Sequence, residues 1–442
     1  MKTYDVVIVG LGYVGLTLAT SMAEVGLRVF GFERRKDVVD LTNQGKPHFS
    51  EIGLEEALTR VVRSGHLVAS TTMDPDIRSE NYVITVGTPL NENGKARLDM
   101  IENAAGQVAE HLDDGALVIL RSTVKCGTAR NIVAPILAKT GKKFHIAMCP
   151  ERTLEGNAIQ ELRELPQIVG ADTEEERARA GALFRRLTHT IVDVSSLESA
   201  EIIKLVDNTY RDVQFGFANE VARLCDAVGV NGYEVITSGK LGYKRTNVAL
   251  PGLVGGPCLG KDPHILYESA RERGVALEIT KAGRTVNERQ PFETMDFVVS
   301  ELDKRGFPAD APIAMLGMAF KGLPITDDLR GAMSLKVLEA LREARPQAEI
   351  RLFDPVVSLE KMREEFPGYR VCATQEEAYE NAAAALITNN HPRLAKHAPA
   401  EIVTRMLPHG FIFDYWNHFS SRSPEELGEG YFAVGNRMGA TA

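Results

Sequence analysis

The chain has 442 residues, more than one hydrophobic core usually holds, so two or three domains are expected. A hydrophobic content of 44% and a charged content of 25% are ordinary for a globular protein, and a formal net charge of -9 argues against nucleic acid or an anionic membrane as a partner. No apolar run reaches the roughly 18 residues that span a bilayer, and five scattered cysteines form neither a disulfide framework nor a metal cluster, so we expect a cytoplasmic protein with free thiols, no bound metal and no membrane span.

The first third of the chain alternates β-branched runs with helical stretches. It begins directly in a strand pattern, MKTYDVVIVG, without the apolar core and cleavage site of a signal peptide. Five apolar runs are typical of strands buried on both faces of a parallel sheet: Asp5–Val9, Arg28–Phe32, Tyr82–Val86, Leu117–Leu120 and Phe144–Ala147. They predict a doubly wound domain over residues 1–196.

A long helix follows, from Glu198 to about Gly229, and it leads into a glycine-rich stretch, Gly252–Gly260. These segments predict a helical central domain over residues 197–305. Alternation then returns, with four more predicted strands: Ile313–Leu316, Glu349–Phe353, Ala384–Ile387 and Phe411–Phe413. The predicted fold class is therefore α/β, with two Rossmann-like doubly wound domains, residues 1–196 and 306–442, joined by the helical domain.

A glycine triplet directly after the first predicted strand has the spacing G-x-G-x-x-G: Gly10, Gly12 and Gly15. A strand before it, a helix after it and an acidic residue about 20 positions on are the context of a dinucleotide site. That acidic residue, Glu33, would bind the ribose hydroxyls and favours NAD. Arg34 and Arg35 beside it are suited to the 2′-phosphate of NADP, although we interpret both as solvated loop residues.

Two further loops follow predicted strands: VGTP, with Thr88, and RSTV, with Thr123. Loops at the carboxyl ends of parallel strands line the ligand crevice of such a sheet. Ordinary turn chemistry explains these residues equally well at this point.

Cys258 stands apart from the four other cysteines because it lies among glycines, in GLVGGPCLGKDPHIL. A thiol near the start of a helix and beside Lys261 is expected to have a lowered pKa. The structural alternative is that Asp262 and Pro263 merely begin that helix and that Cys258 is incidental.

Two polar pairs also have a structural alternative. Lys204 and Asn208 share one face of the long helix, where such a pair is usually solvated. Glu151 and Glu155 in CPERTLEG follow a predicted strand, and taken alone they would be surface acids.

Taken together, these segments resemble the UDP-glucose/GDP-mannose dehydrogenase family along nearly the whole chain. The resemblance rests on seven segments in the family's order: GLGYVGL, VGTP, STVKCGT, PERTLEG, KLVDNTYRDVQFGFANE, GGPCLGKD and LGMAFKGLPITDDLR. It implies an NAD-binding domain, a central dimerising domain and a sugar-nucleotide domain. It also implies a four-electron oxidation of an alcohol to an acid through a cysteine thioester, in a homodimer or higher homo-oligomer.

The resemblance assigns roles to particular residues. The implied catalytic residues are Cys258, Lys204, Asn208, Asp262, Thr123, Glu151 and Glu155. The implied cofactor-binding residues are Gly10, Gly12, Tyr13, Val14, Gly15, Glu33, Arg34, Thr88, Thr123, Lys261 and Arg330. The implied substrate-binding residues are Glu151, Arg152, Leu154, Glu155, Lys204, Asn208, Arg245, Gly255, Phe320 and Lys321. Which of Glu151 and Glu155 serves as hydrolytic base stays open.

The chain departs from the family pattern at three places, where Glu33 replaces the common Asp, Gly260 a proline, and Gly331-Ala332 the frequent Glu-Ser. None of these departures removes a reacting group. The forms NTYRDVQFGFANE and LPGLVGGPCLGKDP are most similar to the branch acting on UDP-N-acetylmannosamine or UDP-N-acetylglucosamine. UDP-glucose and GDP-mannose remain alternatives, as do a two-electron hydroxyacid-type dehydrogenase and a non-catalytic nucleotide-binding protein.

Overall fold

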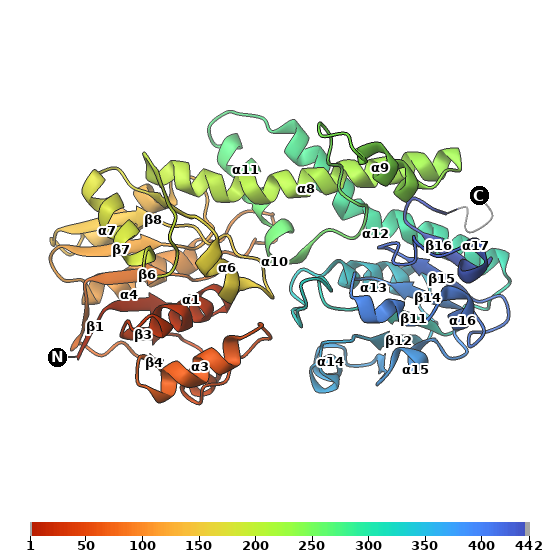
Figure 1. Ribbon diagram of the computed structural model, residues 1–442, viewed down its shortest axis with the longest axis horizontal. Helices are drawn as coiled ribbons and strands as arrows, with labels where there is room; N and C mark the ends of the chain where they lie inside the picture. Colours follow the sequence, from red (N-terminus) through yellow and green to blue (C-terminus); the bar gives the residue numbers. More distant parts are fainter. Residues whose placement is uncertain (1, 438–442) are drawn as a thin grey trace. The chain divides into compact units, whose positions relative to one another are not determined.

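A computed structural model describes residues 2–437 of the chain (Figure 1). The chain divides into two compact units: unit 1 comprises Met1–Asn208 and His264–Ala276, and unit 2 comprises Thr209–Pro263 and Leu277–Ala442. The boundary falls inside two helices, α8 (Leu197–Val228) and α11 (Asp262–Arg271). No helix among residues 2–437 is long and apolar enough to cross a membrane. The three-domain division at 196 and 305 stays a prediction.

Unit 1 is built on an eight-stranded sheet in which all pairs are parallel except β8 with β9. Its strand order is β10 (Ile191–Val194), β9 (Gln167–Gly170), β8 (Phe144–Met148), β7 (Ala116–Leu120), β6 (Asn81–Ile84), β2 (Val6–Val9), β3 (Val29–Phe32) and β4 (Leu67–Ser70). A separate parallel pair joins β1 (Lys2–Tyr4) and β5 (Ile77–Ser79). The helices are α1 (Tyr13–Glu24), α2 (Lys36–Asn43), α3 (Leu54–Arg63), α4 (Asp99–His111), the π-helix η1 (Ala129–Val133), α5 (Ala134–Ala138), α6 (Ala158–Glu164) and α7 (Glu174–Phe184).

Both faces of this sheet are buried, as the continuous apolar strands predict. Val6 and Ile8 pack into one core, with side chains from α1, α3, α6 and α7. Val7 and Val9 point the other way, into a second core with α4, α5 and the first turns of α8. Successive residues of a strand face opposite sides, so an uninterrupted apolar run requires a layer of helices on each side.

Unit 2 repeats this architecture with a six-stranded, fully parallel sheet. Its order is β13 (Arg370–Val371), β12 (Ile350–Phe353), β11 (Ile313–Leu316), β14 (Ala384–Ile387), β15 (Phe411–Asp414) and β16 (Tyr431–Ala433). The helices are α9 (Gly232–Lys240), α10 (Gly256–Leu259), α12 (Glu278–Lys304), α13 (Met333–Ala344), α14 (Leu359–Glu365), α15 (Gln375–Tyr379), the 3-10 helix η2 (Pro392–Ala395), α16 (Pro399–Val403) and α17 (Pro424–Leu427).

The predicted fold class is confirmed: each unit contains a Rossmann-like, mainly parallel sheet, and between the two sheets in sequence lies a helical segment that contains the 32-residue α8. The sequence prediction missed several strands. Val192 and Asp193 in β10 are exposed, and so is Val68 in β4. In the sequence, Asp193 interrupts the apolar run of β10, and the run of β4 is only three residues long, so neither strand shows the longer run that identified the central ones.

Gly216 lies inside the continuous helix α8, and the reason for a glycine there lies in unit 2. A Cβ atom at Gly216 would stand 2.9 Å from the Cα of Gly283 in α12. The two glycines therefore let the α8 and α12 backbones approach closely, which brings polar side chains of both helices together next to the glycine-rich stretch.

Candidate functional site

In the turn between β2 and α1, the backbone has open space beside Gly12 but is tightly packed at Gly15. A Cβ atom at Gly15 would stand 1.8 Å from the Gly10 carbonyl oxygen, whereas a Cβ atom at Gly12 would meet no atom within 4 Å. Gly10 has a φ of +97°, which favours glycine. Gly15 thus permits helix–strand packing, while Gly12 leaves open space at the start of α1, where a pyrophosphate is held in dinucleotide-binding folds.

The carboxylate of Glu33 is fixed beside this turn. Its Oε2 accepts a hydrogen bond from the Leu11 amide at 2.9 Å, and its Oε1 accepts one from the Arg35 amide at 3.0 Å. Arg34 is exposed, and exposed Arg35 pairs with Asp37 at 2.5 Å. The interpretation of both arginines as solvated loop residues agrees with these positions.

Tyr13 joins α1 to the PERTLEG segment. Its hydroxyl donates to the carboxylate of Glu51, which also accepts the amides of Gly156 and Ala158 at 2.7 Å each. Burial, followed by the hydrogen bond to Glu51, raises the pKa of Tyr13 well above its usual range, so the phenol stays protonated. Val14, beside it, is half-buried. Sequence reasoning missed Glu51 because its partner lies 105 positions away.

The two threonine loops meet at the carboxyl ends of β6 and β7. The buried Thr88 hydroxyl donates to the backbone carbonyl of Thr123, which is itself half-buried. This bond holds VGTP and RSTV together on the edge where ligands of parallel sheets bind.

Glu151 is buried, so its interpretation as a surface acid is wrong. It is 9% exposed, and its Oε1 lies 4.0 Å from Nη2 of Arg121. Arg121 is itself buried and donates to the Cys149 carbonyl at 3.1 Å and to Gln167 at 2.8 Å. Arg121 therefore places a buried positive charge beside the Glu151 carboxylate. The sequence did not single out Arg121, although a charge directly after an apolar strand was a usable signal. Glu155 is half-buried.

Arg152 connects the PERTLEG segment to α8. It donates to Asp207 at 3.1 Å and to the Pro166 carbonyl at 3.0 Å. Asp207 directly precedes Asn208. The neighbouring Leu154 amide donates to Glu161 at 2.7 Å, which fixes the backbone between Glu151 and Glu155.

Lys204 and Asn208 are 6% and 7% exposed, so the solvated-surface alternative is wrong for both. They lie one turn apart on one face of α8. Burying an ammonium group costs free energy unless a partner or a ligand compensates for it. Their burial favours a functional role.

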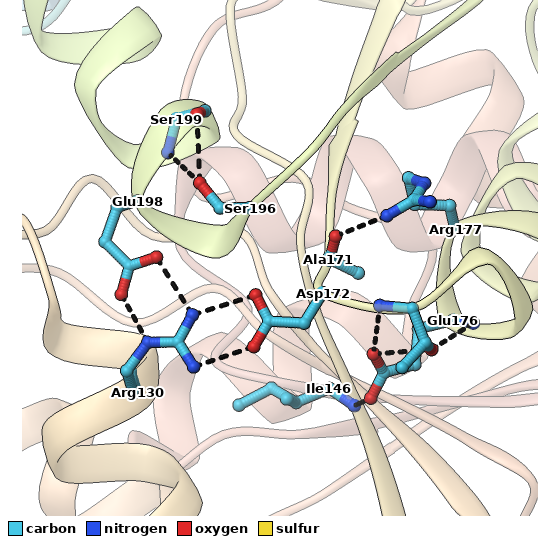
Figure 2. A network of polar contacts seen from close by, with 10 residues as sticks. Arg130, Ile146, Ala171, Asp172, Glu176, Arg177, Ser196, Glu198 and Ser199 are labelled. Atoms are coloured by element: carbon cyan, nitrogen blue, oxygen red, sulfur yellow. Dashed lines mark hydrogen bonds and ion pairs between the residues drawn. The ribbon is translucent and has the colours of Figure 1, made fainter.

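The start of α8 is anchored by Arg130, which lies between two carboxylates in Figure 2. It donates to Asp172 at 2.7 and 2.8 Å and to Glu198 at 2.6 and 3.1 Å. The bidentate guanidinium holds the pKa of both carboxyls below their usual range. This network sets the position from which Lys204 and Asn208 extend.

Glu201 forms a second, fully buried anchor one turn further along α8. Its carboxylate accepts the amides of Gly127 at 2.5 Å and Ala129 at 2.9 Å, and it is 1% exposed. Burial raises the pKa of Glu201 to about 7 despite these two donors.

Glu201 should make the stability of the fold depend on pH. Its folded-state pKa lies above the unfolded value, so its contribution favours the native state at low pH and is lost as pH rises from about 4.5 to about 7. Relative to Glu201→Gln, the free energy of unfolding of the wild type should fall by up to about 3 kcal/mol between pH 5 and pH 8, since a tenfold change in proton affinity is about 1.4 kcal/mol. Urea unfolding of both proteins measures this difference, and a difference independent of pH would refute it.

In unit 2, Cys258 lies in the short helix α10 and is exposed, whereas Cys126, Cys149, Cys225 and Cys372 are buried. Gly256, with a φ of +85°, donates its amide to the Gly331 carbonyl at 2.7 Å. A Cβ atom at Gly256 would approach the Phe320 ring to 2.4 Å. The cysteine segment therefore packs directly on the segment that contains Phe320 and Gly331. The departure at Gly331 is explained by its φ of +63°.

Lys261 and Asp262, which follow α10 in the chain, form an ion pair. The Lys261 Nζ donates to Asp262 Oδ1 at 2.8 Å, and Asp262 is fully buried as the first residue of α11. The structural alternative for Asp262, a role at the helix start, agrees with this position and does not exclude a catalytic one.

Three further residues of unit 2 with predicted phosphate or sugar contacts are cationic, namely Lys321, Arg330 and Arg245. Lys321 lies with its Nζ 5.2 Å from the centre of the Phe320 ring. Arg330 pairs with Asp328 at 2.5 Å and is largely exposed. Arg245 is exposed, with its guanidinium 4.8 Å from the centre of the Tyr243 ring. Gly255 packs close to Gly331, because a Cβ atom added at Gly255 would stand 2.7 Å from the Gly331 carbonyl oxygen.

The predicted site residues thus form two sets. Unit 1 brings together the glycine turn, Glu33, the paired threonine loops, the PERTLEG segment and the buried face of α8. Unit 2 brings together the cysteine segment, Gly255, Phe320 and Lys321. In the described part of the chain, no group of three or more His, Cys, Asp or Glu side chains is placed to hold a metal ion.

Three sequence profiles of the UDP-glucose/GDP-mannose dehydrogenase family match successive parts of the chain. The NAD binding domain matches residues 4–188, the central domain residues 198–289 and the UDP binding domain residues 314–421. The matched ranges include every segment on which the resemblance rests.

Individual proteins match along nearly the full length. The UDP-N-acetyl-D-mannosamine dehydrogenase of Pyrococcus horikoshii is 33% identical over 421 residues, which cover 92% of this chain and 94% of the relative. The enzyme of the same name from Escherichia coli K12 is 29% identical, over 88% of this chain and 94% of the relative. A solved structure of the Pyrococcus horikoshii enzyme covers 99% of this chain and 100% of its own at a TM-score of 0.87 and 30% identity. The structure of a UDP-glucose dehydrogenase from Pyrobaculum islandicum has a TM-score of 0.86 and a sequence identity of 27%, and the match covers 98% of each chain.

Proposed function

The chain belongs to the UDP-glucose/GDP-mannose dehydrogenase family, and from this premise we propose that it oxidises the C6 alcohol of a UDP-N-acetylhexosamine to a carboxylate. The observation that carries the proposal is the accessible thiol of Cys258, in a chain whose four other cysteines are buried. The choice of sugar rests on the full-length relatives named UDP-N-acetyl-D-mannosamine dehydrogenase. UDP-glucose and GDP-mannose are the competing substrates.

NAD would be held by the glycine turn and the side chains around it. Open space beside Gly12, the fixed carboxylate of Glu33 and the solvated Arg34 suit an unphosphorylated adenosine ribose. NAD, when bound, accepts hydride from the substrate carbon. The remaining proposed contacts are Tyr13, Val14, Thr88, Thr123, Lys261 and Arg330.

Cys258 would serve as the covalent nucleophile of the second oxidation. Its thiolate adds to the carbon of the C6 aldehyde and forms a thiohemiacetal, whose oxygen takes up a proton. That carbon can give up a second hydride, for which a second NAD would be the acceptor, because loss of the hydroxyl proton then restores a C=O bond and leaves a thioester on Cys258. Water adds to the thioester, the C–S bond breaks, and the acid leaves with the thiol restored.

Lys204 and Asn208 would stabilise the oxygen that becomes negatively charged in these steps. A buried ammonium group and a buried amide are the kind of preorganised donors that lower such barriers. Asp262, buried and paired with Lys261, would exchange protons with an ordered water.

Thioester hydrolysis needs a base, and two carboxylates are candidates. Glu151 lies 4.0 Å from the buried Arg121, and Thr123 would position the attacking water. Glu155 is the alternative base. The sugar nucleotide itself would be bound by Arg152, Leu154, Arg245, Gly255, Phe320 and Lys321.

A substrate panel tests this function. Purified protein is assayed with NAD and, separately, UDP-N-acetylmannosamine, UDP-N-acetylglucosamine, UDP-glucose and GDP-mannose. The proposal expects the highest kcat/KM with one of the two UDP-N-acetylhexosamines. Equal or higher kcat/KM with UDP-glucose or GDP-mannose would refute the proposed substrate class.

We further propose that the protein is a homodimer that uses an apolar stripe on α8. Within unit 2, this helix carries exposed apolar side chains at intervals of seven and four residues: Tyr210, Phe217, Leu224 and Val228, at 63%, 55%, 63% and 65% exposure. Such spacing places them on one face, and an identical stripe on a second copy matches it by symmetry.

Phe217→Asp should therefore split the dimer, because a carboxylate buried between two helices without a partner is unfavourable. Light scattering after gel filtration should give the mass of two chains for the wild type and of one chain for the variant. Ile52→Asp, at an exposed position of unit 1, is the control and should stay dimeric. A monomeric wild type, or a dimeric Phe217→Asp, would rule out this interface.

A further inference from the structure

The backbone that carries Cys258 is held by a buried arginine from α12. Arg284 donates from Nη2 to the Val254 carbonyl at 2.8 Å and from Nη1 to the Leu259 carbonyl at 2.9 Å. These two carbonyls flank the stretch that contains Cys258. The Arg284 side chain is 4% exposed. A planar guanidinium bonds the two carbonyls from two separate nitrogens in a fixed fork, whereas an ammonium group carries its three donors on one nitrogen and does not reproduce that geometry.

Asp212 in α8 balances the charge of this arginine. Its Oδ1 lies 2.6 Å from Arg284 Nη1, and its side chain is fully buried. Asn287 donates to the same Oδ1 and to the Asp212 backbone carbonyl at 2.9 Å each. The guanidinium is thereby fixed in one orientation.

A third contact extends the network to the beginning of the glycine-rich stretch. Asn219 donates to Asn287 Oδ1 at 2.9 Å and to the Gly252 carbonyl at 3.1 Å, and it accepts the Gly252 amide at 2.9 Å. Gly252, Val254 and Leu259 are therefore all bonded to side chains of α8 and α12. The close approach of the two helices at Gly216 and Gly283 makes this possible.

We propose that Arg284 is a positioning residue for Cys258: it holds the 254–259 backbone so that the thiol is presented in one reactive geometry. The inference rests on the proposed function for its catalytic meaning, but the geometry of the thiol can be measured without substrate. Arg284 donates to the cysteine segment itself rather than only between helices, and a residue that served the helix packing alone would not need these two carbonyls. A reacting atom misplaced by about 1 Å can cost about a hundredfold in rate.

The test variant is Arg284→Lys, which keeps a positive charge beside Asp212 but has all its donors on one nitrogen and so loses the two-nitrogen fork that bonds the carbonyls. Arg289→Met, at a largely exposed position of the same helix, is the matched control. Cys258 alkylation by iodoacetamide is followed across pH, since the other cysteines are buried. Turnover with the best UDP-sugar gives kcat and KM separately.

We expect Arg284→Lys to change the alkylation rate of Cys258 at least threefold or to shift its pH midpoint, and to lower kcat at least tenfold with KM within threefold of the wild type. Arg289→Met should match the wild type. If Arg284→Lys does not fold, the double variant Asp212→Leu/Arg284→Met is measured instead, because replacing both members of a buried ion pair by apolar residues commonly preserves folding. It should show the same losses.

A folded variant with the alkylation profile and kcat of the wild type would overturn the positioning role. Failure of the proposed function looks different: the wild type would then oxidise no UDP-sugar, while the alkylation comparison would still decide the role of Arg284.

Discussion

Replacing Cys258 by serine should lower the rate of uronate formation by about a thousandfold or more, the order expected when a covalent nucleophile is lost. A serine hydroxyl remains protonated at neutral pH and attacks the aldehyde poorly without a dedicated base. Because Cys258 is exposed, the substitution removes no core packing, and the thermal midpoint of unfolding should stay within a few degrees of the wild type. The assay is production of the acid from a UDP-sugar with excess NAD.

The matched control is Cys225→Ala, which removes a buried thiol that has no proposed part in the reaction. It should keep the kcat of the wild type, although its unfolding midpoint should fall because buried packing is lost. An unimpaired Cys258→Ser protein would eliminate the thioester mechanism and would favour a simple two-electron dehydrogenase.

Lys204→Met should lower kcat about 10²–10³-fold with a smaller effect on KM, the size expected when one donor to a developing negative charge is removed. Methionine is similar to lysine in length, so it fills the buried space without the charge. Lys204 is only 6% exposed, and a buried ammonium group is worth far more to a developing alkoxide than a solvated one. Steady-state kinetics of the variant measure this loss.

Arg211→Met is the control for this experiment, because it removes a cation from an exposed position of the same helix. It should leave kcat within twofold of the wild type. Lys204→Met with the kcat of the wild type would show that the buried lysine does not take part in the reaction.

The central strands were predictable because a strand buried on both faces requires an apolar residue at every position, and such a run is visible in the sequence. Val6–Val9 and Ile313–Leu316 are apolar at every position, and both lie in the middle of parallel sheets. The length of α8 was predictable as well, to within one residue at each end. The edge strand β10 was not, because Asp193 interrupts the apolar pattern there.

Of the functional features, those that rest on local motifs were also predictable, and those that rest on distant contacts were not. The glycine turn, Glu33 and the family were readable from local motifs, and the prediction of an NAD-dependent nucleotide-sugar dehydrogenase is confirmed by the family match. Arg284 was not readable, because it acts on a segment about 25 residues earlier and pairs with Asp212, 72 positions away. Buried supporting side chains are defined by tertiary contacts, and no local pattern marks them. The roles assigned to individual site residues stay predictions.

The most direct test of the proposed chemistry is the number of NADH molecules formed per sugar. Purified protein is incubated with excess NAD and a limiting, known amount of each UDP-N-acetylhexosamine until absorbance at the NADH band stops rising. The four-electron route through Cys258 predicts two NADH per sugar consumed and the uronic acid as product. One NADH per sugar, with the aldehyde or ketone as product, would contradict it.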